Sequence, residues 1–259
     1  MEFTGQKLER KTIKKPPGGG KPPLCIVGTA GSSGAAPYTE EIDGEYIYEI
    51  WTGGNAPAKE DVLRVDRAFE LHPKRYWGQL VVTTRLSNYD CPIYMQDHYE
   101  EIPNSVKFPY EEVRKQFYIP VMGDDLYVTN TITWMLLLAI HEGYTDINIY
   151  GVHMAHETEH AYQRSSCSWA LGIIQGLNMC GHDIKLYIHP DSSLLHAEYE
   201  YGFGEPTKQM MYVKDMMNSY IAGIDQGRKE ISDKQIRIYK TEGAVEACKH
   251  LYDKLAGFK

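Results

Sequence analysis

The stretch TNTITWMLLLAIHEGYTDINIYGV (residues 129–152) joins a predicted helix to a predicted strand and decides the fold class. Residues 129–143 start with a Thr or Asn cap, continue as an apolar run and end at Gly143, which is typical of a buried helix. Residues 144–152 are rich in β-branched and aromatic residues, which is typical of a strand. A buried helix that leads directly into an apolar strand is the repeating unit of a parallel sheet.

The same alternation extends toward both ends of the chain. Short apolar or β-branched runs bounded by breakers predict further strands at 24–28, 45–51, 68–73, 91–96 and 182–190. Residues 165–181 predict a second helix. We therefore expect an α/β, Rossmann-like fold, in which a mainly parallel sheet carries helices on both faces.

Composition divides the chain into three predicted parts. The Pro/Gly-rich segment KKPPGGGKPP (residues 14–23) indicates that residues 1–23 form a disordered basic arm. Residues 24–204 hold the alternating pattern and are the predicted nucleotide-binding and catalytic domain. Residues 205–259 are predicted to be a helical, amphipathic C-terminal extension.

Charge and cysteine usage limit the function classes. The 259-residue chain has a net charge of −8, although residues 1–21 contribute +4, so the remainder is strongly acidic and disfavours a broad nucleic-acid groove. The longest apolar run, 134–140, is too short to cross a bilayer, so no membrane partner is expected. No leading segment has the apolar core of a signal peptide. Five scattered cysteines without CxxC pairs predict reduced thiols and a cytoplasmic location.

Residues 153–164, HMAHETEHAYQR, contain HETEH, a match to the H-E-x-x-H pattern of zinc peptidases. That pattern requires both histidines on one helix face and a third ligand downstream. The segment instead follows a predicted strand directly, and the extended H-x-x-G-x-x-H pattern is absent from the sequence. We interpret it as a polar loop that supplies groups for proton transfer and phosphate binding. The catalytic candidates are His153, His156, His160 and Arg164.

In open parallel sheets, ligands bind beyond the carboxyl ends of the strands, where strand order reverses. The small-residue loop GTAGSSG follows the first strand, a Gly-Gly-Asn turn follows the second, and TNT starts the buried helix. Each can hold a phosphate or ribose through backbone N–H groups and hydroxyls. A tight turn or an ordinary helix cap explains each of them as well. The resulting nucleotide-binding candidates are Gly28, Thr29, Ser32, Ser33, Asn55, Thr129, Asn130 and Thr131.

A dense polar run, RVDRAFELHP, surrounds the third predicted strand. Its acceptor-binding candidates are Arg67, Glu70 and His72. Arginine suits phosphate recognition, but surface pairing with an acid such as Asp66 is the alternative for Arg64 and Arg67.

Three segments together carry a resemblance to a known family: GTAGSS (28–33), residues 127–154, and IKLYIHPDSSLL (184–195). They resemble the Rossmann-like transferases that include bacterial sialyltransferases of the Campylobacter type. The archaeal-type 6-hydroxymethylpterin diphosphokinases belong to the same wider group, and similar chains occur in bacteriophage genomes.

The resemblance implies roles for particular residues. Gly28 and Ser32 would contact nucleotide phosphates, and residues 129–131 would contact ribose and phosphate. At the end of the late strand, the matching positions are Pro190, Ser192, Ser193 and Leu194, and the two serines join the nucleotide-binding candidates. The family's catalytic histidine lies in a lid after the strand that corresponds to 144–152, which is the region of His156 and His160.

Together these patterns predict a transferase that uses a nucleotide-activated donor, most simply a nucleotide sugar, and a hydroxyl acceptor. A hydroxylated base in phage DNA, engaged by the basic arm, is an extension of this hypothesis. Three alternatives stay open: a zinc hydrolase, a non-catalytic protein that sequesters a nucleotide, and an enzyme that transfers diphosphate from ATP. Only the ATP enzyme requires Mg²⁺, with Asp66, Asp124 or Asp125 as ligands; the leading hypothesis predicts no metal.

Overall fold

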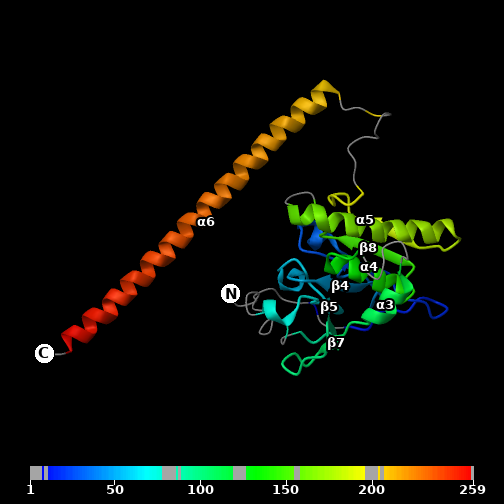
Figure 1. Ribbon diagram of the computed structural model, residues 1–259, viewed down its shortest axis with the longest axis horizontal. Coiled ribbons are helices and arrows are strands. Elements are labelled where there is room, and N and C mark those ends of the chain that lie inside the picture. The colour runs from blue at the N-terminus through cyan, green and yellow to red at the C-terminus, as the bar shows by residue number, and fades with distance from the viewer. Residues whose placement is uncertain are drawn as a thin grey trace. The chain divides into compact units, whose positions relative to one another are not determined.

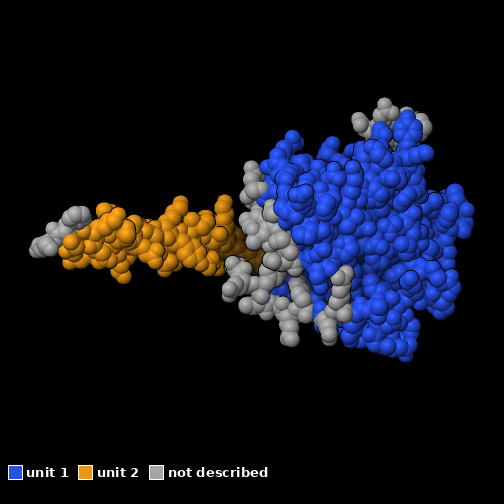
Figure 2. All heavy atoms as spheres, turned by 90° about the horizontal axis from the view of Figure 1, so that it is seen from below, with its two compact units in different colours: residues 1–196 blue, residues 197–259 orange. Residues whose placement is uncertain are grey.

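The computed structural model describes residues 8, 11–77, 86, 89–118, 127–154, 158–195, 204 and 207–257. The chain divides into two compact units, residues 1–196 and 197–259, which are coloured separately in Figure 2. The predicted boundary at residues 204 and 205 lies eight residues further along the chain.

A seven-stranded sheet forms the centre of the first unit, and every neighbouring pair of strands is parallel. The spatial order is β7-β6-β5-β4-β1-β8-β9. The strands are β1 (Leu24–Val27), β4 (Glu49–Gly53), β5 (Arg67–Phe69), β6 (Ile93–Met95), β7 (Ser105–Lys107), β8 (Asp146–Tyr150) and β9 (Lys185–Ile188). This arrangement confirms the predicted α/β fold with a mainly parallel sheet.

Strand order reverses between β1 and β8. From β1 the chain builds the sheet outward in one direction through β4, β5, β6 and β7, and then returns to place β8 and β9 on the other side of β1. In register, Val27 at the end of β1 pairs with Tyr150 at the end of β8. The carboxyl ends of these two strands therefore define the switch point at which an α/β sheet binds ligands.

Three α-helices and one apolar core cover one face of the sheet (Figure 1). They are α3 (Tyr110–Gln116), α4 (Thr131–His141) and α5 (Thr158–Met179). Helix α4 is buried along most of its length, so it forms the middle of this layer. Its ends agree with the predicted cap signals, because the Asn130 side chain accepts from the Thr133 N–H and Gly143 has a φ of +81°.

On the other face, the described residues include short 3-10 helices and irregular segments. Cys25, Val27 and Ile50 of the sheet pack there against Tyr38 and Val62. The 3-10 helices among the described residues are η1 (Gly31–Ala35), η2 (Ala56–Ala58) and η3 (Lys74–Tyr76).

Two predicted elements differ most from the structure. Residues 45–51 form two strands, because β3 (Glu45–Tyr46) pairs antiparallel with β2 (Glu41–Ile42) in a separate hairpin, and β4 starts only at Glu49. Helix α5 begins at residue 158, so the predicted polar loop is wrong from that residue on. Polar residues such as Gln163 and Arg164 form its first turns, where an apolar pattern gives no signal.

The predicted disorder of residues 1–23 is wrong for residues 11–14. Ile13 forms a parallel bridge with Tyr46, whose N–H donates to the carbonyl of Thr12 at 2.9 Å. Lys14 returns a backbone bond to the Tyr46 carbonyl at 2.8 Å. The segment thus adds backbone pairing to the hairpin, which its Pro/Gly-rich continuation does not reveal.

The second unit contains one long helix, α6 (Lys208–Ala256), which confirms the predicted helical extension. Thr207 caps it by accepting from the Met210 N–H at 3.2 Å. None of its residues is buried. Within the described part of the chain, no helix combines the length and the apolar character needed to cross a membrane.

The loops that follow β1 and β8 touch at Gly28 and Gly151. A Cβ atom added to Gly28 would lie 2.4 Å from the Gly151 carbonyl oxygen, and one added to Gly151 would lie 2.9 Å from the Ser33 Cβ. Gly151 also has a φ of +62°, which strains any L side chain. Both positions therefore require glycine, and their contact fixes the geometry of the switch point.

We expect Gly151→Ala to lower the free energy of unfolding by roughly 3 kcal/mol, because crowding costs roughly 1–3 kcal/mol and the left-handed backbone roughly 1–2 kcal/mol more. Urea unfolding followed by tryptophan fluorescence measures this in the first unit, which holds Trp51, Trp77, Trp134 and Trp169. Gly143→Ala is the control, since its φ is +81° but nothing lies within 4 Å. It should cost only roughly 1 kcal/mol; equal losses would contradict a role for crowding.

Candidate functional site

Backbone hydrogen bonds join the loop after β1 to the loop after β8. The Gly28 N–H donates to the Tyr150 carbonyl at 2.9 Å, and the Ala30 N–H donates to the Gly151 carbonyl at 2.7 Å. The Gly151 N–H donates in return to Ser32 Oγ at 3.0 Å. Gly28 and Ser32 thus meet at the switch point, as expected, although their first role there is to join the two loops.

The loop after β9 is fastened to the same place by two serines. The Ser192 hydroxyl donates to the Val152 carbonyl at 2.6 Å, and the Met154 N–H donates to Ser193 Oγ at 2.7 Å. Both serines are at least nine-tenths buried. Their hydroxyl oxygens therefore hold the loops together. They can contribute to nucleotide binding by fixing the shape of the loop.

Ser33, Lys59 and Asp61 form a polar cluster beneath the first loop. Ser33 is fully buried; its hydroxyl donates to Asp61 Oδ2 at 2.7 Å and accepts from Lys59 Nζ at 2.7 Å. Lys59 also donates to the carbonyl oxygens of Thr29 and Ala30 at 3.1 and 3.3 Å. Burial acts to raise the pKa of Asp61, but the hydrogen bonds from Ser33 and Lys59 outweigh it and lower that pKa. The carboxylate is thus ionised at neutral pH.

Lys59 is a cation at the switch point, and it is not among the binding residues predicted from the sequence. It follows the turn after β4 and directly succeeds η2, and 29% of its side chain remains exposed. A lysine just after a Gly-Gly-Asn turn at a strand end was the available signal. Asn55, from the same turn, and Thr29, from the first loop, are both exposed.

The start of α4 stands beside the carboxyl end of β4. A Cβ atom added to Gly53 would lie 3.2 Å from Thr131 Cγ2, so the first helical residue almost touches the strand end. The Asn130 amide donates to the Gln163 carbonyl at 3.0 Å and thereby links α4 to α5. The first N–H groups of a helix have no partner within it and carry positive partial charge. This helix start therefore adds anion-binding potential to the edge of the sheet.

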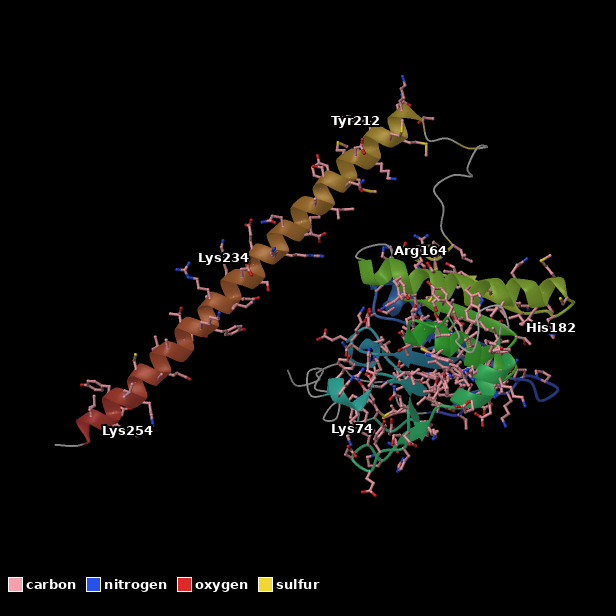
Figure 3. All side chains as sticks on the ribbon, in the orientation of Figure 1. Lys74, Arg164, His182, Tyr212, Lys234 and Lys254 are labelled. Carbon is pink, nitrogen blue, oxygen red and sulfur yellow. The ribbon has the colours of Figure 1, made fainter. Side chains whose placement is uncertain are left out.

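The four catalytic candidates are placed unequally. His153 is exposed, and its Nδ1 lies 3.1 Å from the Asp191 carbonyl oxygen, between the loops after β8 and β9. Arg164 is half-buried on α5 (Figure 3). His156 and the side chain of His160 lie outside the described residues.

Glu70 and His72 form a pair just after β5. Glu70 is 2% exposed and its carboxylate is hydrogen-bonded to Nδ1 of His72, whose side chain is 52% exposed. A buried carboxylate that holds one ring nitrogen fixes the orientation of an imidazole, and this imidazole is about half exposed. The pair can therefore bind an acceptor hydroxyl or remove its proton.

A cavity of about 700 Å³ opens at the same edge, beyond β5, β6 and β7. It is lined by Leu71, Gln96, Lys107, Phe108, Pro109, Tyr110, Glu111, Glu112 and Trp134. The Trp134 ring centroid lies 5.4 Å from that of Phe108 and 5.5 Å from that of Tyr110. The sequence does not predict this site, because its aromatic residues come from segments predicted as core or from segments with no predicted element.

Arg67 does not lie with these groups. It begins β5, so it is at the amino edge of the sheet, where its Nε is 2.7 Å from Glu49 and its Nη1 is 2.8 Å from Glu142. Its guanidinium also donates to the hydroxyl of Tyr144 at 3.2 Å. The predicted acceptor role is therefore corrected to a structural one, because a residue that begins a parallel strand lies at the opposite edge of the sheet from residues that follow the strand.

Asp66 is likewise committed at the amino edge. It is 9% exposed, lies 2.5 Å from Arg64 Nη1, and accepts from the Ile50 N–H at 2.7 Å. Burial raises its pKa, although the Arg64 guanidinium opposes the shift. This position does not suit a Mg²⁺ ligand at the site. Asp124 and Asp125 lie outside the described residues, and within the described ones no group of three His, Cys, Asp or Glu side chains is arranged to hold a metal.

No protein-family model and no curated protein matches this chain. Among solved structures it is similar to the sialyltransferase CstII from Campylobacter jejuni in complex with the substrate analogue CMP-3FNeuAc. The two share 13% identity over 73% of this chain and 97% of that one, with a TM-score of 0.46. For CstII in complex with cytidine-5'-monophosphate, the values are 14%, 75%, 99% and 0.44. This distant likeness assigns no role to any residue of this chain.

We expect Arg67→Met to lower the free energy of unfolding by roughly 3 kcal/mol, because it leaves the buried Glu49 carboxylate without its cation. Adding Glu49→Gln should restore part of that loss by removing the unpaired charge. Lys74→Met is the control, since Lys74 pairs with Glu101 but is 59% exposed, and it should cost roughly 0.5 kcal/mol or less. Urea unfolding compares the three, and an Arg67 effect as small as that of Lys74 would contradict the structural role.

Proposed function

We propose that this protein is a transferase that binds a nucleotide-activated donor, most simply a nucleotide sugar, at the switch point between β1 and β8. The observation that carries the proposal is the convergence of the loops after β1, β8 and β9 at one place, with the start of α4 and Lys59 at the same edge. The segments that resemble the sialyltransferase group are the ones that meet there, although they are far apart in the sequence.

Within this proposal, the nucleotide-binding candidates have two kinds of role. Four of them use their side chains for hydrogen bonds within the protein, so they shape the site: Ser33, Asn130, Ser192 and Ser193. Other candidates are exposed or half-buried, so they are the ones that a donor could reach. These are Thr29, Ser32, Asn55, Thr129 and Thr131.

The cavity beside Trp134 suits the acceptor. Its aromatic wall offers a stacking surface for a ring, and Lys107, Gln96 and Glu111 supply polar groups around it. The Glu70–His72 pair follows the same strand as Leu71 of the cavity. An acceptor hydroxyl bound there would lie on the carboxyl side of the sheet, as the donor does.

The proposed chemistry needs one base and one stabilised leaving group. A histidine removes the proton of the acceptor hydroxyl, the oxygen forms a bond to the donor carbon, and the bond from that carbon to the nucleotide phosphate breaks. Lys59 and the N–H groups at the start of α4 stabilise the negative charge that the departing phosphate gains. His153, His156, His160 and His72 are the candidates for the base, and Arg164 for a further phosphate contact.

The extension to a DNA acceptor has lost support. It depends on a free basic arm, whereas Lys11 is paired with Glu41 at 2.7 Å and Lys14 with Asp43 at 2.5 Å. These pairs neutralise part of the charge that would have engaged phosphates.

A screen of CMP, UDP, GDP and ATP, each with and without Mg²⁺, tests the donor site. We expect at least one nucleotide to raise the melting temperature by roughly 5 °C at about 100 times its Kd. Gly31→Glu should weaken that nucleotide at least about tenfold, because Gly31 has open space at the first loop and the added charge repels phosphate. Gly172→Glu adds the same charge to an open position of α5 and should have no effect. Stabilisation by none of the eight conditions overturns the proposal.

Single changes of His72, His153, His156 and His160 to Asn identify the base. For one of them we expect kcat for transfer from the stabilising nucleotide's sugar to fall about 100-fold or more. The Kd of the nucleotide should change less than about twofold, since a base does not hold the donor phosphate. His182→Asn, beyond the carboxyl end of α5 (Figure 3), is the control. If zinc copurifies and is lost with His156 and His160, the hydrolase alternative replaces this one.

A further inference from the structure

Helix α6 has no buried residue, yet it is rich in large apolar side chains. Its 49 residues correspond to roughly 70 Å of continuous helix. An isolated helix gains little stability from propensity alone, and most helices are stabilised by packing an apolar face. The arrangement of the apolar residues along α6 therefore indicates what packs against it.

These residues follow a strict seven-residue repeat. The first column of the repeat is apolar at all seven positions: Met210, Met217, Ile224, Ile231, Ile238, Val245 and Tyr252. Three residues after each of them lies a second column: Val213, Tyr220, Gly227, Lys234, Thr241, Cys248 and Leu255. Alternating spacings of three and four residues are the a and d positions of a coiled coil.

The length of the repeat specifies a helical partner. A straight α-helix has 3.6 residues per turn, so a seven-residue repeat drifts by ~20° per heptad around its surface. Between Met210 and Tyr252 this amounts to roughly 120°. Only a second helix wound around α6 in a left-handed supercoil stays in contact with the whole column.

The second column selects the direction of the partner. If two copies of α6 lay parallel and in register, each residue of this column would face itself. Gly227 would then leave a gap at the axis, and Lys234 would face a like charge. In an antiparallel pair with full overlap, Gly227 faces Ile238 of the second copy and Lys234 faces Ile231 of the second copy. Small and polar residues then always meet a large apolar one.

The charges beside the columns agree with this pairing. In the antiparallel arrangement, Glu230 lies next to Arg237 of the second copy. The two-fold axis repeats this pair, which gives two attractive contacts near the centre of the helix. The polar centre thus fixes the register that the apolar ends leave free.

We infer that α6 is a self-association element, which joins two copies of this chain through an antiparallel, fully overlapping two-stranded coiled coil. The occupant of its apolar seam is α6 of the second copy. This inference is independent of the proposed catalytic activity.

Disulfide cross-linking of the full chain tests both the partner and the direction. In the antiparallel pair, Cys248 faces Met217 of the second copy, so Met217→Cys in a Cys180→Ser background should give a covalent dimer under mild oxidation with diamide. Residues 217 and 248 of one helix are roughly 45 Å apart, far beyond disulfide reach, so the bond can form only between chains. Cys180 is replaced because it is the other exposed cysteine of the described residues.

Two controls decide between outcomes. The Cys180→Ser chain without a new cysteine should form no covalent dimer on oxidation, because the two Cys248 residues lie at opposite ends of the pair. Ser219→Cys, two residues from Met217 but outside both columns, should also give none. A dimer through Cys248 alone would show a parallel pair, and failure of Met217→Cys to cross-link would equally overturn the inference.

Light scattering of the unoxidised chain gives an independent readout. We expect a dimer whose Kd rises roughly 100-fold on Ile231→Lys, which buries an unpaired charge beside Lys234 of the second copy. Ser232→Lys changes the next, outward-facing residue and should leave the dimer intact. Tryptophan fluorescence should be unchanged in both variants, because all four tryptophans lie outside α6. A monomer at every concentration, or a dimer indifferent to Ile231→Lys, overturns the inference.

Discussion

The close approach of Gly28 and Gly151 is the constraint on which the first unit depends. These residues follow two neighbouring parallel strands, and their backbones come so near that neither tolerates a Cβ atom. Because the two loops share hydrogen bonds at that point, the loop after β1 cannot move independently of the loop after β8. The serines of the loop after β9 then attach to Val152 and Met154, so three separate stretches of chain behave as one rim. The glycines that resemble a phosphate-binding loop are thus required first for packing, and that packing is what places the exposed groups of the loop at the switch point.

Much of the fold could be predicted from the sequence because its signals are local. Helix α4 is predicted by an Asn cap, an apolar run and a terminal glycine, and the structure has all three features. The elements that could not be predicted depend on distant partners. Residues 12–14 are ordered by Tyr46, and residues 45–46 separate from β4 because β2 pairs with them. Strand β7 and helix α3 are too short for their periodicity to stand out, at three and seven residues.

The candidate site was predictable in its location but not in the use of its side chains. Hydroxyls and amides at strand ends mark the carboxyl edge of the sheet, yet Ser33, Ser192 and Asn130 direct theirs into the protein. A sequence cannot distinguish a hydroxyl that meets a ligand from one that holds a loop, since both favour the same residue at the same place. Arg67 and Lys59 show a second limit. The arginine begins a strand and so belongs to the opposite edge, whereas the lysine follows a strand-end turn and belongs to the site. An error of a few residues in a predicted strand boundary therefore assigns a residue to the wrong edge of the sheet.

The two units are stabilised by different means. The first buries its apolar residues within one chain, around a sheet with cover on both faces. Helix α6 buries none of its own, although its apolar residues are as regularly spaced as those of a core. On a straight helix that regularity is blurred, because a seven-residue repeat and a 3.6-residue turn fall out of step along its length. Its sequence therefore resembles a weakly amphipathic helix when it is taken alone. The same residues form a continuous seam once a second helix supplies the supercoil, so the order in this segment is a property of two chains and is only half expressed in one.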